Sequence, residues 1–476
     1  MSMVGWTGHA CGASAAMRNS DAPPNAANIE VSRLGRLSWA LFEWGRNPSF
    51  TLISLYIYAP YFARDVVGDP VRGQALWGEV SGWAGLMVAL CAPFLGAIAD
   101  AGGRRKPWVA FFVAIMILSS ALLWYGMPMG AGFSLFAIAL LIALNNFGYD
   151  ASIVFHGAML PFVARPGRVG RLSGLGYALG NISTLLLLLF VLIFFAQAEN
   201  PLFGLDRISH EHERIVGPIC ALWLAAFCIP FLLWTPDRPP SMRPLRVVVG
   251  EGLRSLGRTV KSLRHYRNVA KYLAARMIYN DGLNMMLLFG GVYASGVFGW
   301  ELEQRGVFGI VLSVFAILGG LIGGRMADTI GARRSLQITL GGVIVGGVIS
   351  LGFAPDRMFF VFPYVPGTEV AALPFFRTGP ELGYIGVISL VAVCVVASYA
   401  NSRTLMARLA PERRMTEFFG LYALSGEATA FAAPIAVAIA TTISGSQQWG
   451  MAAILVFLAI GLVGLSFVRE ERAEEI

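Results

Sequence analysis

The sequence predicts an all-α polytopic membrane protein with twelve transmembrane helices in two related six-helix halves, and three observations lead to this prediction. The 476 residues are 56% hydrophobic and only 13% charged, and their mean hydropathy is +0.65. A soluble protein would carry about 25% charged residues. The apolar residues fall in blocks of about 20, the length that crosses a bilayer as a helix. Finally, one basic loop pattern occurs twice, about half a chain apart.

The apolar blocks give the order of the elements. The predicted helices cover residues 37–63, 75–99, 107–126, 133–163, 172–197, 215–235, 268–295, 306–327, 335–354, 383–408, 416–443 and 449–468. The first six form an N-terminal half at 36–235, and the last six form a C-terminal half at 268–468. A cytoplasmic linker with an amphipathic helix joins the halves at 236–267. Residues 1–35 are predicted to be a disordered cytoplasmic tail, and residues 469–476 a second cytoplasmic tail.

The distribution of Lys and Arg predicts the orientation. If both termini face the cytoplasm, most of the 36 Lys and Arg residues lie on that side, as the positive-inside rule requires. The net charge of +8 then reflects loops that face anionic lipid, so we expect no nucleic-acid partner. The five cysteines show neither a disulfide framework nor metal-ligand spacing, and we expect no cofactor and no metal. We expect a monomeric multi-pass protein of the plasma membrane, which in a bacterium is the inner membrane.

The duplicated loop follows the second and the eighth predicted helix. Many secondary transporters consist of such duplicated halves. The residues of the pattern are Gly96, Asp100, Gly103, Arg104 and Arg105 in the first copy, and Gly324, Asp328, Gly331, Arg333 and Arg334 in the second. Charge-assisted bonds in such clusters can hold one conformation and break in another. We therefore predict a cytoplasmic gate, and the alternative is that these arginines only set the topology.

The first predicted helix carries charged residues, which cost about 2.5–3.5 kcal/mol each inside a membrane. Glu43, Arg46 and Asn47 lie three and four residues apart and therefore share a face. Gly45 and Pro48 favour a local break, which would free backbone groups to contact a ligand. We predict that this face binds the solute, and the alternative is a structural ion pair that locks the helix.

Two further predicted helices, the fourth and the seventh, carry polar clusters, and the cluster of the seventh lies at the place in the C-terminal half that matches the first-helix cluster in the N-terminal half. The residues are Asn146, Asp150 and His156 in the fourth predicted helix, and Asn280, Asp281 and Asn284 in the seventh. We expect both clusters to face a cavity between the halves. For His156, the alternative is a histidine that is hydrogen-bonded between two helices.

The eleventh predicted helix contains Glu427, which has no cation near it in the sequence. A carboxylate inside a membrane helix must pair with a group on another helix or take up a proton. Glu427 and Asp281 are therefore our candidates for the proton carrier. The alternative for Glu427 is a neutral side chain that is bonded to a backbone carbonyl.

The sequence contains no catalytic motif. It has no G-x-S-x-G elbow, no H-E-x-x-H pair and no phosphate-binding loop with its lysine. We therefore expect that the protein is not an enzyme. A membrane enzyme and a sensor that does not transport remain as remote alternatives.

At these residues the chain resembles a known family. Both loops resemble motif A of the major facilitator superfamily. Four segments resemble the branch of the vacuolar amino-acid effluxer of autophagy and its bacterial relatives: Trp39 to Trp44, Phe155 to Pro161, Tyr279 to Gly282, and Glu417 to Gly426. The resemblance covers about residues 35–470. It implies a major facilitator fold of two pseudo-symmetric six-helix halves, a central cavity, alternating access and gating by motif A.

The chain departs from the usual pattern of this branch at three places. The first helix has Glu43-Trp44-Gly45-Arg46-Asn47 where the branch has Asp-Trp-Ala-Asn-Ser. The fourth helix has His156-Gly157 where the branch has Tyr-Asn, and the eleventh has Glu427 where the branch usually has Lys. A cation is thus gained in the first helix and one is lost in the eleventh, and Arg46 could have taken over the role of counter-charge.

These observations together predict a secondary active transporter of a small solute that is coupled to protons. An amino-acid-like zwitterion would suit a cavity that holds both Arg46 and carboxylates. The alternative is an exporter of drugs or lipophiles, which cavity aromatics with Met285 and Met286 would favour.

Overall fold

The computed structural model describes residues 31–473, except for 129–130, 197, 199–200, 242–243, 245, 253, 255–265, 301, 372 and 431. Most of the predicted N-terminal tail and much of the predicted linker helix lie outside the described residues. Residues 246–252 of the linker are helical.

In the described residues, each predicted span of the N-terminal half is helical over most of its length. Its helices are α1 (Arg33–Thr51), α2 (Tyr58–Tyr61), α3 (Pro70–Gly102), α4 (Lys106–Leu122), α5 (Leu135–Val163), α6 (Val169–Val191), α7 (Glu211–Arg214) and α8 (Val216–Trp234). Two π-helical turns, Leu52–Tyr56 and Phe62–Val66, flank α2 and continue the first predicted span. This span is therefore a chain of short helical pieces beyond Thr51.

The C-terminal half repeats this pattern and adds a hairpin. Its elements are α10 (Arg267–Phe298), α11 (Leu302–Ile330), α12 (Ala332–Ser350), β1 (Arg357–Met358), β2 (Phe362–Pro363), α13 (Gly379–Leu409), α14 (Met415–Glu427), α15 (Ala432–Ser444) and α16 (Gln447–Ser466). The strands β1 and β2 pair antiparallel.

The predicted helix 416–443 consists of two helices, because it is interrupted between Glu427 and Ala432. Pro434 lies in the first turn of α15. A proline has no N–H to continue the hydrogen bonds of a preceding helix, and it is tolerated in the first turn. The interruption lies near the middle of the predicted span.

The surface is that of a membrane protein. In the described part of the chain, nine helices are long and apolar enough to cross a bilayer. The predicted spans 37–63, 268–295 and 335–354 are also largely helical but are not among these nine, and the first two carry the polar clusters described above. Large apolar side chains such as Phe136 and Leu222 are 78% and 72% exposed, as lipid-facing residues are.

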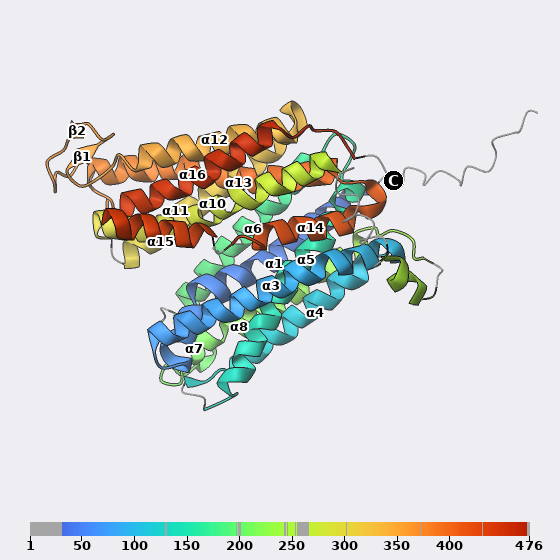
Figure 1. The fold of residues 1–476 in the computed structure, drawn as a ribbon. Helices are drawn as coiled ribbons and strands as arrows, with labels where there is room; N and C mark the ends of the chain where they lie inside the picture. Colours follow the sequence, from blue (N-terminus) through green and yellow to red (C-terminus); the bar gives the residue numbers. More distant parts are fainter. Residues whose placement is uncertain are drawn as a thin grey trace, which may run out of the picture.

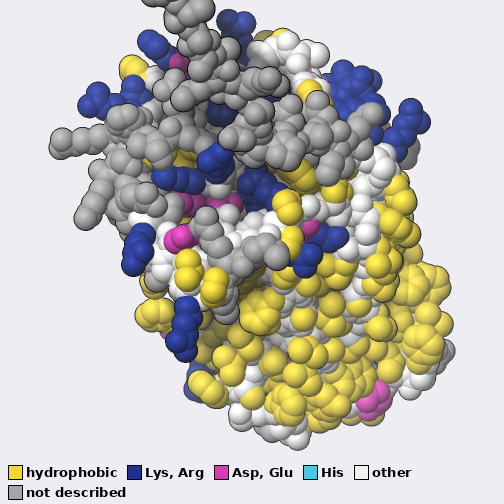
Figure 2. Space-filling view, turned by 90° about the vertical axis from the view of Figure 1, so that its right-hand side faces the viewer, with side chains coloured by type: hydrophobic (Ala, Val, Ile, Leu, Met, Phe, Trp, Pro, Cys, Tyr) yellow, Lys and Arg dark blue, Asp and Glu magenta, His cyan; other side chains and the backbone are white. Residues whose placement is uncertain are grey.

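The two halves form two helix bundles that meet along a seam (Figure 1). At the seam, α3 and α5 lie against α14, and α6 lies against α11 and α13. We call the end of the molecule with the loops of Asp100 and Asp328 the latch end; α7 and the β1–β2 hairpin lie at the opposite end. Figure 2 faces the latch end and shows Lys and Arg side chains gathered beside a broad hydrophobic surface.

Glycines allow the backbones to touch at this seam. A Cβ atom at Gly324 would lie 2.5 Å from the Gly170 carbonyl oxygen, and one at Gly174 would lie 2.1 Å from that of Gly320. In the symmetric contact, a Cβ at Gly96 would lie 2.4 Å from the Thr416 carbonyl oxygen. The first glycine of each copy of the loop pattern, Gly96 and Gly324, therefore has a packing role at the seam.

We predict that Gly324→Ala lowers the stability of the protein, because the added methyl group meets backbone that cannot move aside alone. Overpacking typically costs about 1–3 kcal/mol. Gly341→Ala on α12 is the control, since nothing lies within 4 Å of its Cβ position and alanine is the better helix former by about 1 kcal/mol. Melting in detergent measures both variants, and equal midpoints would contradict the tight seam.

Candidate functional site

The first motif aspartate bonds the two halves together at the latch end. The Asp100 carboxylate accepts a hydrogen bond from the Glu417 backbone N–H at 2.9 Å and one from the Thr416 hydroxyl at 2.7 Å. Both residues lie in the first turn of α14, where backbone N–H groups have no partner within the helix. Arg105, which is 1% exposed, donates to Asp100 at 2.8 Å and to Thr416 at 2.7 Å.

The second motif aspartate makes the symmetric contact. The Asp328 carboxylate at the end of α11 accepts hydrogen bonds from the backbone N–H groups of Gly170 and Arg171 at 2.7 and 2.8 Å. These groups belong to the first turn of α6 in the other half. Arg408 on α13 donates to Asp328 at 3.1 Å. Each half therefore caps a helix of the other half with an acid, and we call these two contacts the latch.

The remaining residues of the loop pattern lie around the latch. Gly103 and Gly331 have φ angles of 83° and 92°, which glycine adopts without strain. Arg333 donates to the carbonyl groups of Leu465 and Ser466 within its own half. The side chains of Arg104 and Arg334 are exposed. Because Arg105 pairs with Asp100 in the first loop, Arg333 would be expected to pair with Asp328 in the second. Arg408 of α13 takes that place instead.

A second bond between the halves lies in the predicted first-helix cluster. Glu43, which is 3% exposed, pairs with Arg46 on its own helix and with Arg403 of α13 at 2.6 Å. Arg403 also donates to the hydroxyl and the carbonyl of Ser173 on α6, at 3.0 and 2.8 Å. The Glu43 carboxylate therefore pairs with two buried guanidinium groups, Arg46 of the N-terminal half and Arg403 of the C-terminal half.

His156 completes this cluster on the side of α5. Its ring stacks on Trp39 with 4.1 Å between centroids. Its Nε2 atom lies 2.9 Å from the Trp39 carbonyl oxygen, and its Nδ1 atom lies 3.6 Å from Glu43. The indole N–H of Trp39 donates to the His156 carbonyl at 3.1 Å. His156 is thus a buried contact between α5 and α1.

Two of the predicted asparagines, Asn47 and Asn284, each accept a hydrogen bond from a tyrosine, and the two bonds match between the halves. The Tyr149 hydroxyl donates to Asn47 at 3.2 Å, and the Tyr399 hydroxyl donates to Asn284 at 2.6 Å. Asn146 instead donates to Ser81 on α3 at 3.1 Å. The paired tyrosines come from α5 and α13, which occupy equivalent places in the two halves.

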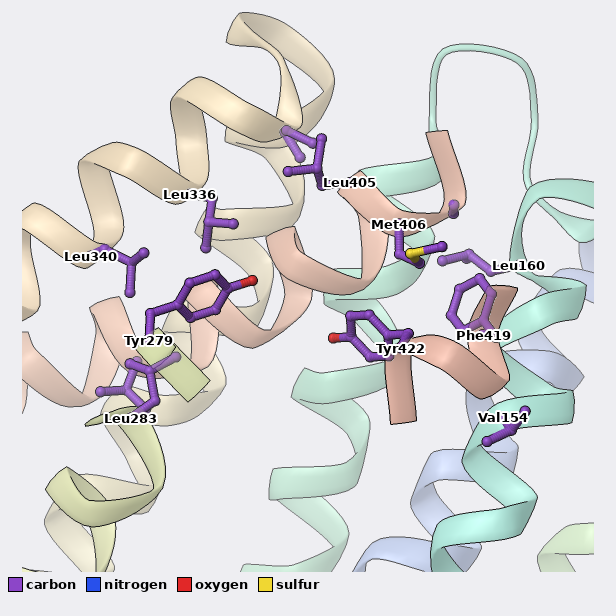
Figure 3. Packing of buried hydrophobic residues seen from close by; sticks show 14 of the residues in the cluster. Val154, Leu160, Tyr279, Leu283, Leu336, Leu340, Leu405, Met406, Phe419 and Tyr422 are labelled. Atoms are coloured by element: carbon purple, nitrogen blue, oxygen red, sulfur yellow. The ribbon is translucent and has the colours of Figure 1, made fainter. Parts of the chain in front are cut away.

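The seventh-helix cluster is organised around a third buried arginine. Arg276 of α10 donates to the Tyr422 carbonyl at 2.7 Å and to the Ser425 hydroxyl at 2.9 Å, and it lies 3.5 Å from the centre of the Tyr422 ring. In Figure 3 the hydroxyl groups of Tyr279 and Tyr422 point toward one another. Each lies within hydrogen-bond distance of the Ser402 hydroxyl, at 2.8 and 3.0 Å.

Three predicted acids lack such partners. Asp281 is 2% exposed, and neither of its carboxylate oxygens has a hydrogen-bond partner among the described residues. Asp150 is half-buried and Glu427 is exposed, and within the described part of the chain neither forms an ion pair. The charges of Asp150 and Glu427 nevertheless interact across the seam.

Arg276 and Arg403 were not predicted as site residues from the sequence. Both lie inside predicted spans, and an arginine inside a span is the same signal that drew attention to Arg46. Each stacks on a tyrosine, since Arg403 lies 4.5 Å from the Tyr177 ring centre and Arg46 lies 4.2 Å from that of Tyr149. Besides Arg105 at the latch end, the centre of the protein therefore contains three buried arginines among the described residues instead of one.

A possible metal site lies at the opposite end, away from these clusters. In the described part of the chain, Asp65, His210 and Glu213 are close enough together to hold a metal ion. Arg64 already pairs with Asp65 at 2.6 Å and with Glu213 at 2.9 Å. The arginine supplies the positive charge that a metal would bring, so this group fits a structural role.

The fold and the site define a transporter of the major facilitator superfamily. Solved structures of this superfamily share the fold. The proton:xylose symporter XylE matches with a TM-score of 0.64 and 13% identity, over 93% of this chain and 97% of that one. A bacterial homologue of the iron transporter ferroportin in its outward-facing state matches with a TM-score of 0.60 and 15% identity, over 91% and 97%.

Residues 79–475 match the family described as "Vacuole effluxer Atg22 like", and the chain belongs to this family. The MFS-type transporter YxiO of Bacillus subtilis (strain 168) is 24% identical over 92% of this chain and 96% of its own length. Autophagy-related protein 22 of Cryptococcus neoformans is 24% identical over 63% of this chain, which spans 51% of the fungal protein. These relatives are transporters, so the protein is a membrane transporter and not an enzyme.

We predict that Asp100→Asn opens the latch, because it leaves Arg105 buried without its carboxylate. Loss of one partner of a buried pair typically costs about 3–5 kcal/mol. Spin labels at the exposed positions 168 and 413, in a background without native cysteines, report the distance between the halves at the latch end. A longer distance should dominate in this variant. Asp356→Asn at the opposite end is the control, and an unchanged distribution in Asp100→Asn would refute the latch.

We also predict strong energetic coupling between Glu43 and Arg403. A double-mutant cycle with Glu43→Gln and Arg403→Ala should give a coupling energy above about 1.5 kcal/mol, as close buried charge pairs do. The exposed pair of Glu369 and Arg377, 3.1 Å apart, is the control and should give less than about 1 kcal/mol. Denaturant unfolding in detergent measures both cycles, and equal couplings would contradict a role for Glu43 in joining the halves.

Proposed function

We propose that the protein is a proton-coupled secondary transporter of a small amino-acid-like solute, and that it works by alternating access. The observation that carries this proposal is the set of buried and partly buried charges between two halves that are joined by a latch. Charges are costly inside a membrane, and they are kept where they contact a solute, an ion or each other. Here some of them pair and others do not.

The latch supports alternating access. Its hydrogen bonds run between the halves, so they must break before a solute can leave at the latch end. The same is true of the bond between Glu43 and Arg403. We propose that the structure represents the state that is closed at the latch end, and that a second state opens there and closes at the opposite end.

The isolated acids support proton coupling. Asp281 has no partner for either carboxylate oxygen among the described residues, and Glu427 lies at the end of α14 with its Oε2 atom 3.0 Å from the Cβ position of Gly85 in the other half. An acid that is isolated in one state and surrounded differently in the other can take up a proton in one and release it in the other. We propose Glu427 or Asp281 as the carrier.

Charges of both signs at the centre support an amino-acid-like solute. The resemblance to amino-acid effluxers agrees with this, since such a solute has a positive and a negative end. Arg46, the positive charge that would suit the carboxylate of such a solute, is 4% exposed and paired with Glu43. A carboxylate would therefore reach it only if Glu43 or Tyr149 moves.

We further propose that the protein acts as a monomer in the plasma membrane with both termini in the cytoplasm. The Lys and Arg side chains on the latch end in Figure 2 support this orientation, because basic loops are retained on the cytoplasmic side. The latch would then be a cytoplasmic gate.

Transport in proteoliposomes tests the proposed function. The purified protein is first heated with amino acids, small peptides, sugars and lipophilic cations at two pH values, since a ligand of the folded state raises the melting temperature. A compound that binds is then offered to proteoliposomes with and without a pH gradient. We expect an amino-acid-like compound to be driven by the gradient. Binding of lipophilic cations alone would favour an exporter of lipophiles.

We predict that Glu427→Gln or Asp281→Asn, whichever removes the proton carrier, reduces gradient-driven accumulation at least about tenfold, because an amide cannot carry a proton through the cycle. In the variant that removes only the proton carrier, the rate of solute exchange without a pH gradient should fall less than gradient-driven accumulation does. Glu369→Gln on the exposed loop is the control and should accumulate solute normally. If both variants kept full accumulation, the proposed carriers would be wrong.

A further inference from the structure

The end of α14 has the properties of a site for a positive charge. The helix ends at Glu427, and a turn at residues 428–430 separates it from α15. The last carbonyl groups of a helix carry partial negative charge, and interrupted helices near the middle of a membrane place such ends at the ligands of transporters. The Glu427 side chain adds a full negative charge at the same place.

A buried acid faces this interruption from α10. Asn280 donates to the Gly426 carbonyl at 3.4 Å, and Thr429 donates to the Met277 carbonyl at 3.3 Å. Asp281 lies one turn after Met277 and therefore on the same face of α10. Asp281 is 2% exposed, and neither carboxylate oxygen has a partner at hydrogen-bond geometry among the described residues, although the Thr429 side chain lies beside it. A buried acceptor without a partner is costly, and a ligand with N–H donors would satisfy it.

A third acid approaches from the other half of the protein. Asp150 lies on α5, which packs against α14, and its charge interacts with that of Glu427. Three carboxylates from three helices thus surround the end of α14. Among the described residues no ion pair within 4 Å holds any of them, although Arg276 attracts Glu427 and Asp281, and Arg46 attracts Asp150, from farther away.

The accessible charges at the centre are negative, whereas the positive ones are covered. Arg46, Arg276 and Arg403 are 4%, 7% and 3% exposed, and each stacks on a tyrosine. Glu427 is exposed and Asp150 is half-buried. A solute that enters between the halves therefore meets carboxylates before it meets a guanidinium group.

We infer that Glu427, Asp281 and Asp150 bind the ammonium group of the transported solute, and that the solute is recognised as an amine and not through a carboxylate. This inference rests on the proposed function and makes it more specific. A primary ammonium has three N–H donors, which match three carboxylates that come from α14, α10 and α5.

This arrangement makes protons and solute compete for the same groups. A carboxylate that has taken up a proton no longer attracts an ammonium ion, so binding weakens as the pH falls. The groups that face Glu427 are the Gly85 backbone on α3, Asp150 on α5, and Arg276 and Asp281 on α10. Competition of this kind exchanges protons for solute, which is antiport.

A pair of matched probes tests the inference on the unmodified protein. Leucinamide keeps the ammonium group of leucine and lacks its carboxylate, and N-acetyl-leucine keeps the carboxylate and lacks the ammonium. We expect leucinamide to raise the melting temperature by several degrees at saturating concentration, with a smaller rise at lower pH, and N-acetyl-leucine to have no effect. Equal effects of the two probes, an effect of N-acetyl-leucine alone, or no effect of leucinamide at any pH would overturn the inference.

Variants and further cations locate the binding site. Glu427→Gln and Asp150→Asn should each weaken leucinamide binding at least about tenfold, whereas Glu369→Gln should leave it unchanged. Unchanged affinity in both site variants would overturn the inference. Tetraphenylphosphonium is a cation without N–H donors, and stabilisation by it equal to that by leucinamide would also overturn the inference. The same holds if sodium stabilises the protein more than potassium does and Glu427→Gln abolishes this difference.

The two proposals fail in different ways. Gradient-driven transport of a solute without an ammonium group would contradict this inference and leave the proposed transport function intact. Binding of leucinamide without gradient-driven flux of any amine would contradict proton coupling and leave the ammonium site intact.

Discussion

An ionised side chain inside a bilayer must find a partner or lose its charge, and this constraint organises the centre of the protein. Arg403 meets Glu43, and Arg276 meets the carbonyl end of α14. Each partner belongs to another helix, so the charges that are costly to bury also hold the helices in place. Against this background the acids Asp281 and Glu427 stand out, because no ion pair in the described structure holds them and Arg276 attracts both only from a distance. Groups that stabilise the fold and groups that are available to a solute can thus be told apart.

The latch uses a different kind of partner. Asp100 and Asp328 bond to backbone N–H groups at the starts of α14 and α6, and every helix has such groups in its first turn. Asp100 keeps its ion pair with Arg105 of the same half when the halves separate, so opening costs only the modest net energy of the hydrogen bonds between the halves. The bond between Glu43 and Arg403 instead joins two buried opposite charges of different halves, and separation breaks the ion pair itself. Separation of the halves therefore needs a compensating interaction at the centre, and a solute or a proton can supply it.

Much of the fold could be predicted from the sequence, because the length of apolar blocks and the spacing of a repeated loop are local properties of the chain. The twelve helical spans and the duplicated acids at the seam follow from them. The interruption of the eleventh span could have been suspected from Pro434, although proline alone does not say on which side the helix stops. The partners of the charged residues could not be predicted, because they depend on contacts between distant segments. Arg408 beside Asp328 and Arg403 beside Glu43 are examples, and neither pairing has a signature in the spacing of residues.

One helix links the site to the latch. The first turn of α14 is capped by Asp100, and its last residue is Glu427. Its 13 residues form a rod about 20 Å long, and Arg276 fixes the far end through Tyr422 and Ser425. A ligand that draws Glu427 toward Asp150 would turn or shift this rod, and the first turn would move against Asp100. The ligand changes the balance between the two states only through its different affinity for them, at about 1.4 kcal/mol for each factor of ten. Because α14 crosses from the centre to the latch end as a single rigid element, that difference can act directly on the bonds that keep the halves together.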